Sequence, residues 1–560
     1  MATESRVVLN PTTMNGGPRI ATTTDDNGDE IQKVTLAGLT DGGVLRNIPV
    51  TPEGHMEVAI HSPRLPFGSL HAENLTPVMA ASGVYGVNTA LMKTTTGLSF
   101  GTGANTGAVT SENNLLICST GTTAYSFAML QSRRRVHYRP GQGIVARFTA
   151  LFSAPVANSV VVGGVGTAEA GFFFGYNGTS FGILHSTGGV REVHTLTITT
   201  ASTATNDYVV TLPNGTTANV TATANMTTTR TAYEISKGTF TGYDAEASGS
   251  TVVFVAKSAG PVSGSFSLAQ TGAIIPAAGT DVETLAGVAP TNTWIAQTDW
   301  NGDVMDGSGS ESNPSGILLD KTKGNIYQIG VQYLGFGAIT FGIETAPSDA
   351  NNPEFVTVHT IRSPNSRTSV TISQPAFPFT MAAYSSGSST NVSISVASFA
   401  AFIEGNVNNL GPRSCYFNTS AITSSTTVYT PILTIRNGLS YKSRANQIVS
   451  HLLSVTGAAR STTGLTTFFL IRDATLTGPT NFAAFSTNSA SDIDTGSTRC
   501  SFTDAEQVIW VGATGESSDF QFPFIDTEIT LQPGETLTLA VRSVTATATC
   551  VGSVNMREDQ

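Results

Sequence analysis

The stretch "NIYQIGVQYLGFGAITFGIE", residues 325–344, constrains the fold more than any other part of the chain. Apolar side chains recur at every second position on both sides of "LGFG": Tyr327, Ile329, Val331, Tyr333, Ile339, Phe341 and Ile343. Period two is the side-chain alternation of a β-strand, in which one face packs on a core. Gly335 and Gly337 supply the backbone freedom of a turn or bulge. The passage predicts two adjoining strands of a layered β protein, with Tyr327 and Tyr333 in the core rather than on a sugar-stacking surface.

Composition extends this prediction to the whole chain. Only 12% of the 560 residues are charged, 40% are hydrophobic, and the chain carries 28 Phe and 13 Tyr. A disordered chain has high charge and few aromatic residues. Frequent turn signals between short apolar runs are typical of sandwiches and barrels. We therefore expect an ordered, mostly-β protein of about three or four domains.

The charge balance argues against nucleic acid as a partner. The formal net charge is −11 and the sequence pI is about 5.2, whereas nucleic-acid binding depends on clustered Lys and Arg that neutralise phosphates. No run approaches the roughly 18–20 apolar residues that span a bilayer, so no membrane insertion is expected. The opening "MATESRVVLN" lacks the basic start and apolar stretch of a secretory signal. We therefore expect the chain to be made in a cytoplasm.

The cysteines indicate no cofactor. Cys118, Cys415, Cys500 and Cys550 show no CxxC spacing, so no zinc or thioredoxin-type motif is present. We expect reduced thiols and no cofactor, and the sequence leaves open a bridge between Cys500 and Cys550.

Changes in character along the chain predict four parts. Residues 1–80 are polar, turn-prone and interrupted by proline, which indicates an extended N-terminal anchoring arm. Residues 81–194 and 286–419 share short apolar strands and are interpreted as one interrupted β-sandwich. Residues 420–560 are predicted to form a C-terminal β-sandwich. The expected fold class is mostly β, a multidomain β-sandwich or jelly-roll-like architecture with a small inserted α+β module.

That inserted module is predicted at residues 195–285, a Thr/Ala-rich segment. Its "LPNGT" step is a hairpin signal. The segment "TRTAYEIS" is the one convincing helix, with Ala232 and Ile235 placed to cover a small sheet.

Four passages carry a resemblance to a known class of proteins. They are "VTPEGHMEVAIHSPRLPFGSLHAENLTPV", "RRRVHYRPGQGIVARFTALF", "SGILLDKTKGNIYQIGVQYLGFGAITFGIE" and "LQPGETLTLAVRSVTATATCVGSVNMRED". Together they resemble virion structural proteins of tailed bacteriophages, and related segments look similar in other large DNA viruses. The 195–285 module is similar to small domains inserted in phage tail and virion-surface proteins.

The resemblance implies a virion component of a tail, baseplate or fibre. Such a protein would assemble with copies of itself and with other virion proteins, and distal loops would contact a host-surface glycan or protein. The first alternative is a capsid decoration or minor capsid protein. The second is a tail-associated carbohydrate-active enzyme, which needs paired carboxylates in a cleft. The sparse Asp and Glu offer no identifiable pair, so no enzymatic activity is expected.

The segment "GHMEVAIH" is a weak candidate for a metal site. His55, Glu57 and His61 share one face if the segment is a strand, and imidazole and carboxylate suit zinc or iron. A trimer would bring three such strands to one axis. The alternative is the polar face of an arm strand.

The segment "DWNGDVMDG" is a second weak metal candidate. Asp299, Asn301 and Asp303 stand at alternate positions, as in calcium loops. Val304 and Ser310 occupy the positions where an EF-hand requires Gly and Glu. An Asx-rich turn is the simpler interpretation.

The basic segment "SRRRVHYRPGQG" is the sharpest charge cluster. Arg133, Arg135, His137 and Arg139 share one face if the chain is extended. We expect these residues to pair with an acidic patch on a neighbouring subunit, the alternative being a solvated face.

Two G-x-S-x-G matches, "GLSFG" and "GTSFG", contain Ser99 and Ser180. A nucleophile elbow needs a strand before the serine and a helix after it. Neither serine is followed by a helical pattern, so both are interpreted as chance matches in a Gly/Ser-rich chain.

Overall fold

The computed structural model describes strand segments between residues 4 and 47, and residues 75–559 except for short internal gaps. The gaps are residues 100–103, 168, 202–204, 222–226, 271–276, 333, 346–353, 373–374, 406–410, 461–463 and 525–528. The chain divides into two units, Met1–Ala72 and Glu73–Gln560. No helix within the described residues has the length and apolar character needed to span a bilayer.

The N-terminal unit contains five short strands. Three form an antiparallel sheet in the order β1-β2-β3, and two form the hairpin β4-β5. Their bounds are β1 Glu4–Val8, β2 Arg19–Thr24, β3 Glu30–Gln32, β4 Ala37–Leu39 and β5 Leu45–Asn47. The remainder of the predicted arm up to residue 74 lies outside the described residues.

The predicted boundary at residue 80 falls inside a strand of the central sandwich. Strand β6 (Leu75–Ser82) pairs with β30 (Ser398–Glu404) at a sheet edge, and the register shifts beside Pro77. Proline has no N–H to donate to the hydrogen bonds between strands, and it is therefore tolerated at sheet edges and at bulges. The two prolines that precede this strand favour an extended arm up to residue 80, but the central sandwich already begins by residue 75.

The central sandwich has two antiparallel sheets. One has seven strands in the order β23-β15-β14-β13-β28-β10-β7; the other has nine, in the order β26-β25-β24-β12-β29-β9-β8, with β30 beside β12 and β6 beside β30. The strand bounds are β7 Met92–Leu98, β8 Ala108–Glu112, β9 Leu115–Ser119, β10 Ser126–Ser132, β12 Ile144–Phe152, β13 Ser159–Gly166, β14 Gly171–Asn177, β15 Ser180–Thr187, β23 Thr291–Ala296, β24 Asn325–Val331, β25 Ile339–Thr345, β26 Glu354–Ile361, β28 Phe379–Ser385 and β29 Ser393–Val396. A short bridge pairs β11 (Val136–His137) with β27 (Ala376–Phe377), and η1 spans Gln297–Asp299.

The alternating stripe forms the middle of this core. Strands β24 and β25 pair antiparallel, and the side chains of Tyr327, Ile329, Phe341 and their same-face neighbours are fully buried. Phe174 from the seven-stranded sheet packs on Tyr327 of the nine-stranded sheet, with ring centroids 4.9 Å apart. The core prediction for Tyr327 is therefore confirmed, while Tyr333 lies outside the described residues. Gln332, which directly follows β24, is also buried.

The inserted module is confirmed by strand pairing. Strands β15 and β23 are hydrogen-bonded neighbours, so the chain leaves the sandwich and returns beside its point of exit. Between them lie two small sheets, β19-β20-β16-β22 and β18-β17-β21, and the helix α1. The bounds are β16 Arg191–Thr200, β17 Tyr208–Thr211, β18 Thr217–Val220, α1 Thr228–Ser236, β19 Tyr243–Ser248, β20 Thr251–Ala259, β21 Ser267–Gln270 and β22 Ala278–Leu285. As predicted, α1 buries Ala232 and Ile235.

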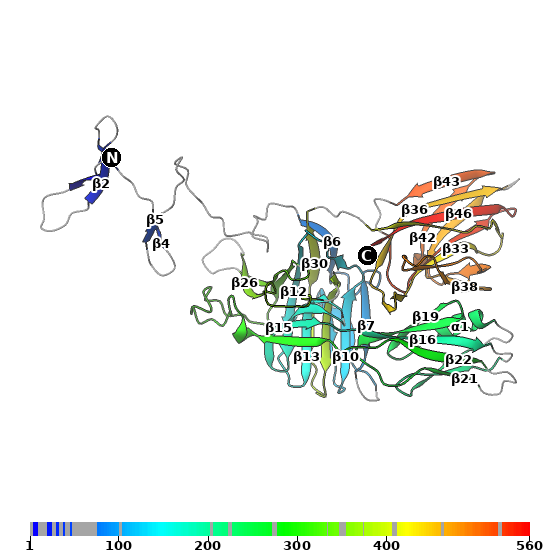
Figure 1. Cartoon of the computed structure of the whole chain (residues 1–560), viewed down its shortest axis with the longest axis horizontal. Helices are drawn as coiled ribbons and strands as arrows, with labels where there is room; N and C mark the ends of the chain where they lie inside the picture. The colour runs from blue at the N-terminus through cyan, green and yellow to red at the C-terminus, as the bar shows by residue number, and fades with distance from the viewer. Residues whose placement is uncertain are drawn as a thin grey trace. The chain divides into compact units, whose positions relative to one another are not determined.

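The C-terminal sandwich also has two sheets, one in the order β31-β46-β36-β43 with β32 and β44 attached, the other in the order β39-β40-β33-β45-β37-β42. It begins at β31, a few residues before the predicted residue 420. The bounds are β31 Arg413–Phe417, β32 Ile422–Thr423, β33 Thr430–Asn437, β34 Ser440–Tyr441, β35 Arg444–Ala445, β36 Val449–Arg460, β37 Thr466–Arg472, β38 Thr475–Thr477, β39 Ala483–Ala484, β40 Ser491–Asp494, β41 Arg499–Ser501, η2 Ala505–Gln507, β42 Val508–Thr514, β43 Ser518–Pro523, β44 Thr530–Leu531, β45 Thr536–Ser543 and β46 Thr549–Asp559. Cys500 and Cys550 are buried free thiols and form no bridge. Figure 1 shows the inserted module beside this sandwich, both next to the central one.

Candidate functional site at the junction of three domains

The predicted basic cluster lies where the central sandwich meets the C-terminal sandwich. Arg133 Nη1 lies 3.1 Å from Glu535 Oε1, and Arg139 Nη2 lies 3.0 Å from Asp559 Oδ2. Both carboxylates belong to the same chain as the arginines. Arg133 and Arg139 therefore pair within the chain, with acidic partners about 400 residues downstream. The expectation that the cluster also pairs with a neighbouring subunit stays a prediction.

The other two members of the cluster are more enclosed. Burial lowers the pKa of Arg135 to about 10, with the nearby charge of Arg191 adding to the effect. Burial also lowers the pKa of His137 to about 4, in spite of the opposing attraction of Asp559. His137 is therefore neutral near pH 7 and forms part of a domain interface, not a charged contact surface.

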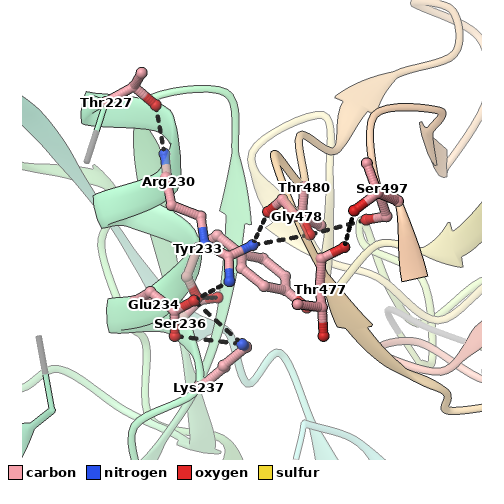
Figure 2. Close-up of polar contacts among 11 residues, drawn as sticks. Thr227, Arg230, Tyr233, Glu234, Ser236, Lys237, Thr477, Gly478, Thr480 and Ser497 are labelled. Carbon is pink, nitrogen blue, oxygen red and sulfur yellow. Dashed lines mark hydrogen bonds and ion pairs between the residues drawn. The ribbon is translucent and has the colours of Figure 1, made fainter. Parts of the chain in front are cut away.

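Helix α1 of the inserted module makes a second contact with the C-terminal sandwich (Figure 2). Arg230 donates from Nη1 to the carbonyl of Gly478 and, over 3.0 Å, to Thr480 Oγ1. Its guanidinium also pairs with Glu234 one helical turn away and lies 4.9 Å from the ring centroid of Tyr233. Desolvation raises the pKa of Tyr233 to about 12. The contact is thus partly shielded from solvent, and it holds one face of the helix against the loop after β38.

The third contact is a buried charge cluster on β33. Arg436 lies 3.4 Å from Glu246 of β19 and also pairs with Asp492 of β40, and its guanidinium donates over 2.7 Å to the carbonyl of Ala247. Glu246 accepts a 2.7 Å hydrogen bond from the backbone of Leu439. Burial alone would lower the pKa of Arg436, but the two carboxylates outweigh it and the pKa is raised. Arg436 is therefore a permanent cation between two domains.

A pocket of about 590 Å³ lies at this junction. All three domains contribute to the wall of this junction pocket. Its charged lining residues are Lys93, Arg133, Arg135, Glu169, Arg191, Asp244, Lys257 and Glu535. Only the 133–139 cluster was recognisable from the sequence, because the other charged residues stand singly in the chain and meet only after folding.

The calcium candidate is a hydrogen-bonded loop. Asp303 is buried and accepts hydrogen bonds from Met305 N, Asn313 Nδ2 and Ser315 N at 2.8–2.9 Å. The Asn301 amide exchanges two hydrogen bonds with the backbone of Thr360. Asp299 lies in η1. These contacts order the loop as an Asx-rich turn, and the described residues contain no group of three His, Cys, Asp or Glu side chains arranged to hold a metal ion.

The second metal candidate, His55, Glu57 and His61, lies outside the described residues. The two serines of the G-x-S-x-G matches can be placed. Ser180 opens strand β15, and its Oγ accepts a 3.4 Å hydrogen bond from Trp294 Nε1. Ser99 Oγ donates to the carbonyl of Tyr125 over 3.1 Å. A serine at the start of a strand does not have the strand–turn–helix setting of a nucleophile elbow.

Comparison with models of known protein families gives no match, and no curated protein sequence matches the chain. Among solved structures, one described as lectin UEA-II complexed with galactose is similar at 8% identity and a TM-score of 0.20. The similarity covers 59% of this chain and 100% of that chain. At that TM-score the likeness bears on neither the fold nor the function of this protein.

Proposed function

We propose that the protein is a virion structural component of a tail, baseplate or fibre, which assembles with copies of itself and with neighbouring virion proteins. The four passages that resemble phage virion proteins support this proposal. Host attachment through a surface glycan or protein belongs to the same proposal, and exposed loops would carry it.

The observation that carries the proposal is the set of charged contacts between domains. Arg436 binds carboxylates of two domains while buried, and removing one partner of such a cluster leaves an uncompensated charge. Arg139 and Arg133 add ion pairs at the other domain boundary. Domains joined in this way hold fixed positions, as a particle component must do outside the cell without turnover.

The enzymatic alternative has no comparable support. A glycoside hydrolase needs two carboxyl groups free to act as acid and base or nucleophile. In the junction pocket, Glu169, Asp244 and Glu535 are each engaged by an arginine or lysine. The test of this alternative is incubation with host polysaccharide, and shortened chains would overturn the structural proposal.

The direct test is imaging of intact particles that carry a label on the C-terminus of this chain. We expect the label at the tail, baseplate or fibres. Label spread over the shell would favour the capsid decoration alternative, and its absence from purified particles would overturn a virion role.

A further inference from the structure

The charges of the junction pocket do not cancel. Each of its three carboxylates pairs with one basic side chain that also lines it: Glu169 with Arg191, Asp244 with Lys257 at 3.5 Å, and Glu535 with Arg133 at 3.1 Å. Lys93 and Arg135 line the same pocket, and neither has an ion-pair partner among the residues that the structure describes. The pocket therefore keeps two uncompensated cations in a chain whose formal net charge is −11.

Arg135 presents an unused hydrogen-bond donor. Its Nη1 is shielded from bulk solvent and has no hydrogen-bond partner within the described part of the chain. Buried polar groups are nearly always satisfied, so an orphaned guanidinium N–H calls for an explanation. Desolvation and the charge of Arg191 both lower the pKa of Arg135, to about 10, which means that its surroundings oppose the cation. A bound anion would accept a hydrogen bond from the unpaired N–H of Arg135 and would stabilise its positive charge.

Lys93 provides the open side of the pocket. It lies on β7, the edge strand of the seven-stranded sheet, and its side chain is accessible to solvent. Desolvation lowers its pKa; Lys257, Arg191 and Arg135 also lower it, while Asp244 opposes them. A ligand can therefore enter past Lys93 and still reach the enclosed Arg135.

We propose that the junction pocket binds an oxyanion, a carboxylate, sulfate or phosphate group, between Lys93 and Arg135. Charge-assisted hydrogen bonds to such groups are the strong ones, and arginine matches their planar or tetrahedral oxygens. The pocket volume of about 590 Å³ lies in the range of small-molecule sites and exceeds the size of a bare inorganic ion. Four threonines also line the wall, together with other polar and apolar residues: Thr94, Thr95, Thr96 and Thr167. An acidic saccharide fits this combination of charge, hydroxyls and size, and the inference does not depend on the virion role.

The experiment is isothermal titration calorimetry on the full chain at constant ionic strength. The probes are glucuronate, inorganic sulfate, inorganic phosphate and neutral galactose. The variants are Arg135→Gln and Lys93→Gln, and Lys323→Gln is the control because Lys323 is an exposed lysine outside the pocket. Lys93→Gln changes a solvent-accessible side chain, so it keeps the test valid if Arg135→Gln fails to fold.

We expect saturable binding of at least one anion, weakened roughly tenfold or more by each pocket variant and unchanged in the control. Tighter binding of glucuronate than of sulfate or phosphate would assign the oxyanion to an acidic saccharide, and the reverse order would assign it to a free inorganic ion. No saturable binding of any anion, equal affinity for galactose and glucuronate, or binding unaffected by both pocket variants would overturn the proposal.

Discussion

At the scale of single residues, His194 gives the inserted module a pH dependence. Its two ring nitrogens lie 2.9 Å from Asp281 and 2.8 Å from Glu192, and these carboxylates raise its pKa although burial opposes them. A raised pKa means that the stabilisation is complete below the ordinary value of about 6.5 and is lost as pH rises through the folded-state value. His194→Gln should therefore destabilise the protein by about 1–3 kcal/mol at pH 6 and by less at pH 9. Thermal unfolding across this range measures the difference. His359 is a control with the opposite pH dependence of stability. Burial lowers the pKa of His359, so the stabilisation that it contributes is lost as the pH falls below about 6.5. Equal destabilisation of His194→Gln at both pH values would contradict the assignment.

At the scale of elements, helix α1 joins two domains through one side chain. Arg230→Ala removes the hydrogen bonds to Gly478 and Thr480 while leaving the buried face of the helix unchanged. Hydrogen bonds to a charged group contribute about 1.5–3 kcal/mol, and partial exposure of Arg230 places the expected loss near the lower value. Lys237→Ala is the matched control, because Lys237 pairs with Glu234 and lies over the ring of Tyr233, both residues of its own helix. Urea unfolding gives the comparison, and an equal loss in both variants would assign the effect to the helix and not to the domain contact.

At the scale of the whole molecule, the charge cluster around Arg436 couples the unfolding of domains. Arg436→Met leaves Glu246 and Asp492 close together without their shared cation, and breaking such a buried cluster costs about 3–5 kcal/mol. We expect calorimetry of the parent protein to show the module and the C-terminal sandwich unfolding together, and the variant to show separate transitions. Arg362→Met, at an exposed arginine, should leave the profile unchanged. Separate transitions in the parent protein would contradict this coupling.

The sequence predicts those parts of the structure that depend on residues close to one another in the chain. The stripe around Tyr327 and the buried face of α1 follow from periods of two and 3.6 residues, which need no knowledge of the rest of the chain. The insertion was recognisable because its composition differs from that of the strands on either side. The partner of Arg436 was not predictable, since Glu246 lies 190 positions earlier and one glutamate in a strand carries no pairing signal. For the same reason, the sequence does not reveal that Arg133 pairs with Glu535 and Arg139 with Asp559. Lys93 and Arg191 of the junction pocket gave no sequence signal either.

The pairing of β15 with β23 makes residues 188–290 a replaceable cassette. Because the two ends of the module emerge from adjacent strands, a short turn can close the gap and leave the host sheet intact. Exchange of the cassette is not neutral for the neighbouring domain, however. Any replacement has to bring its own carboxylate to Arg436 and its own donor to the loop at Gly478, so the C-terminal sandwich selects which cassettes the chain accepts.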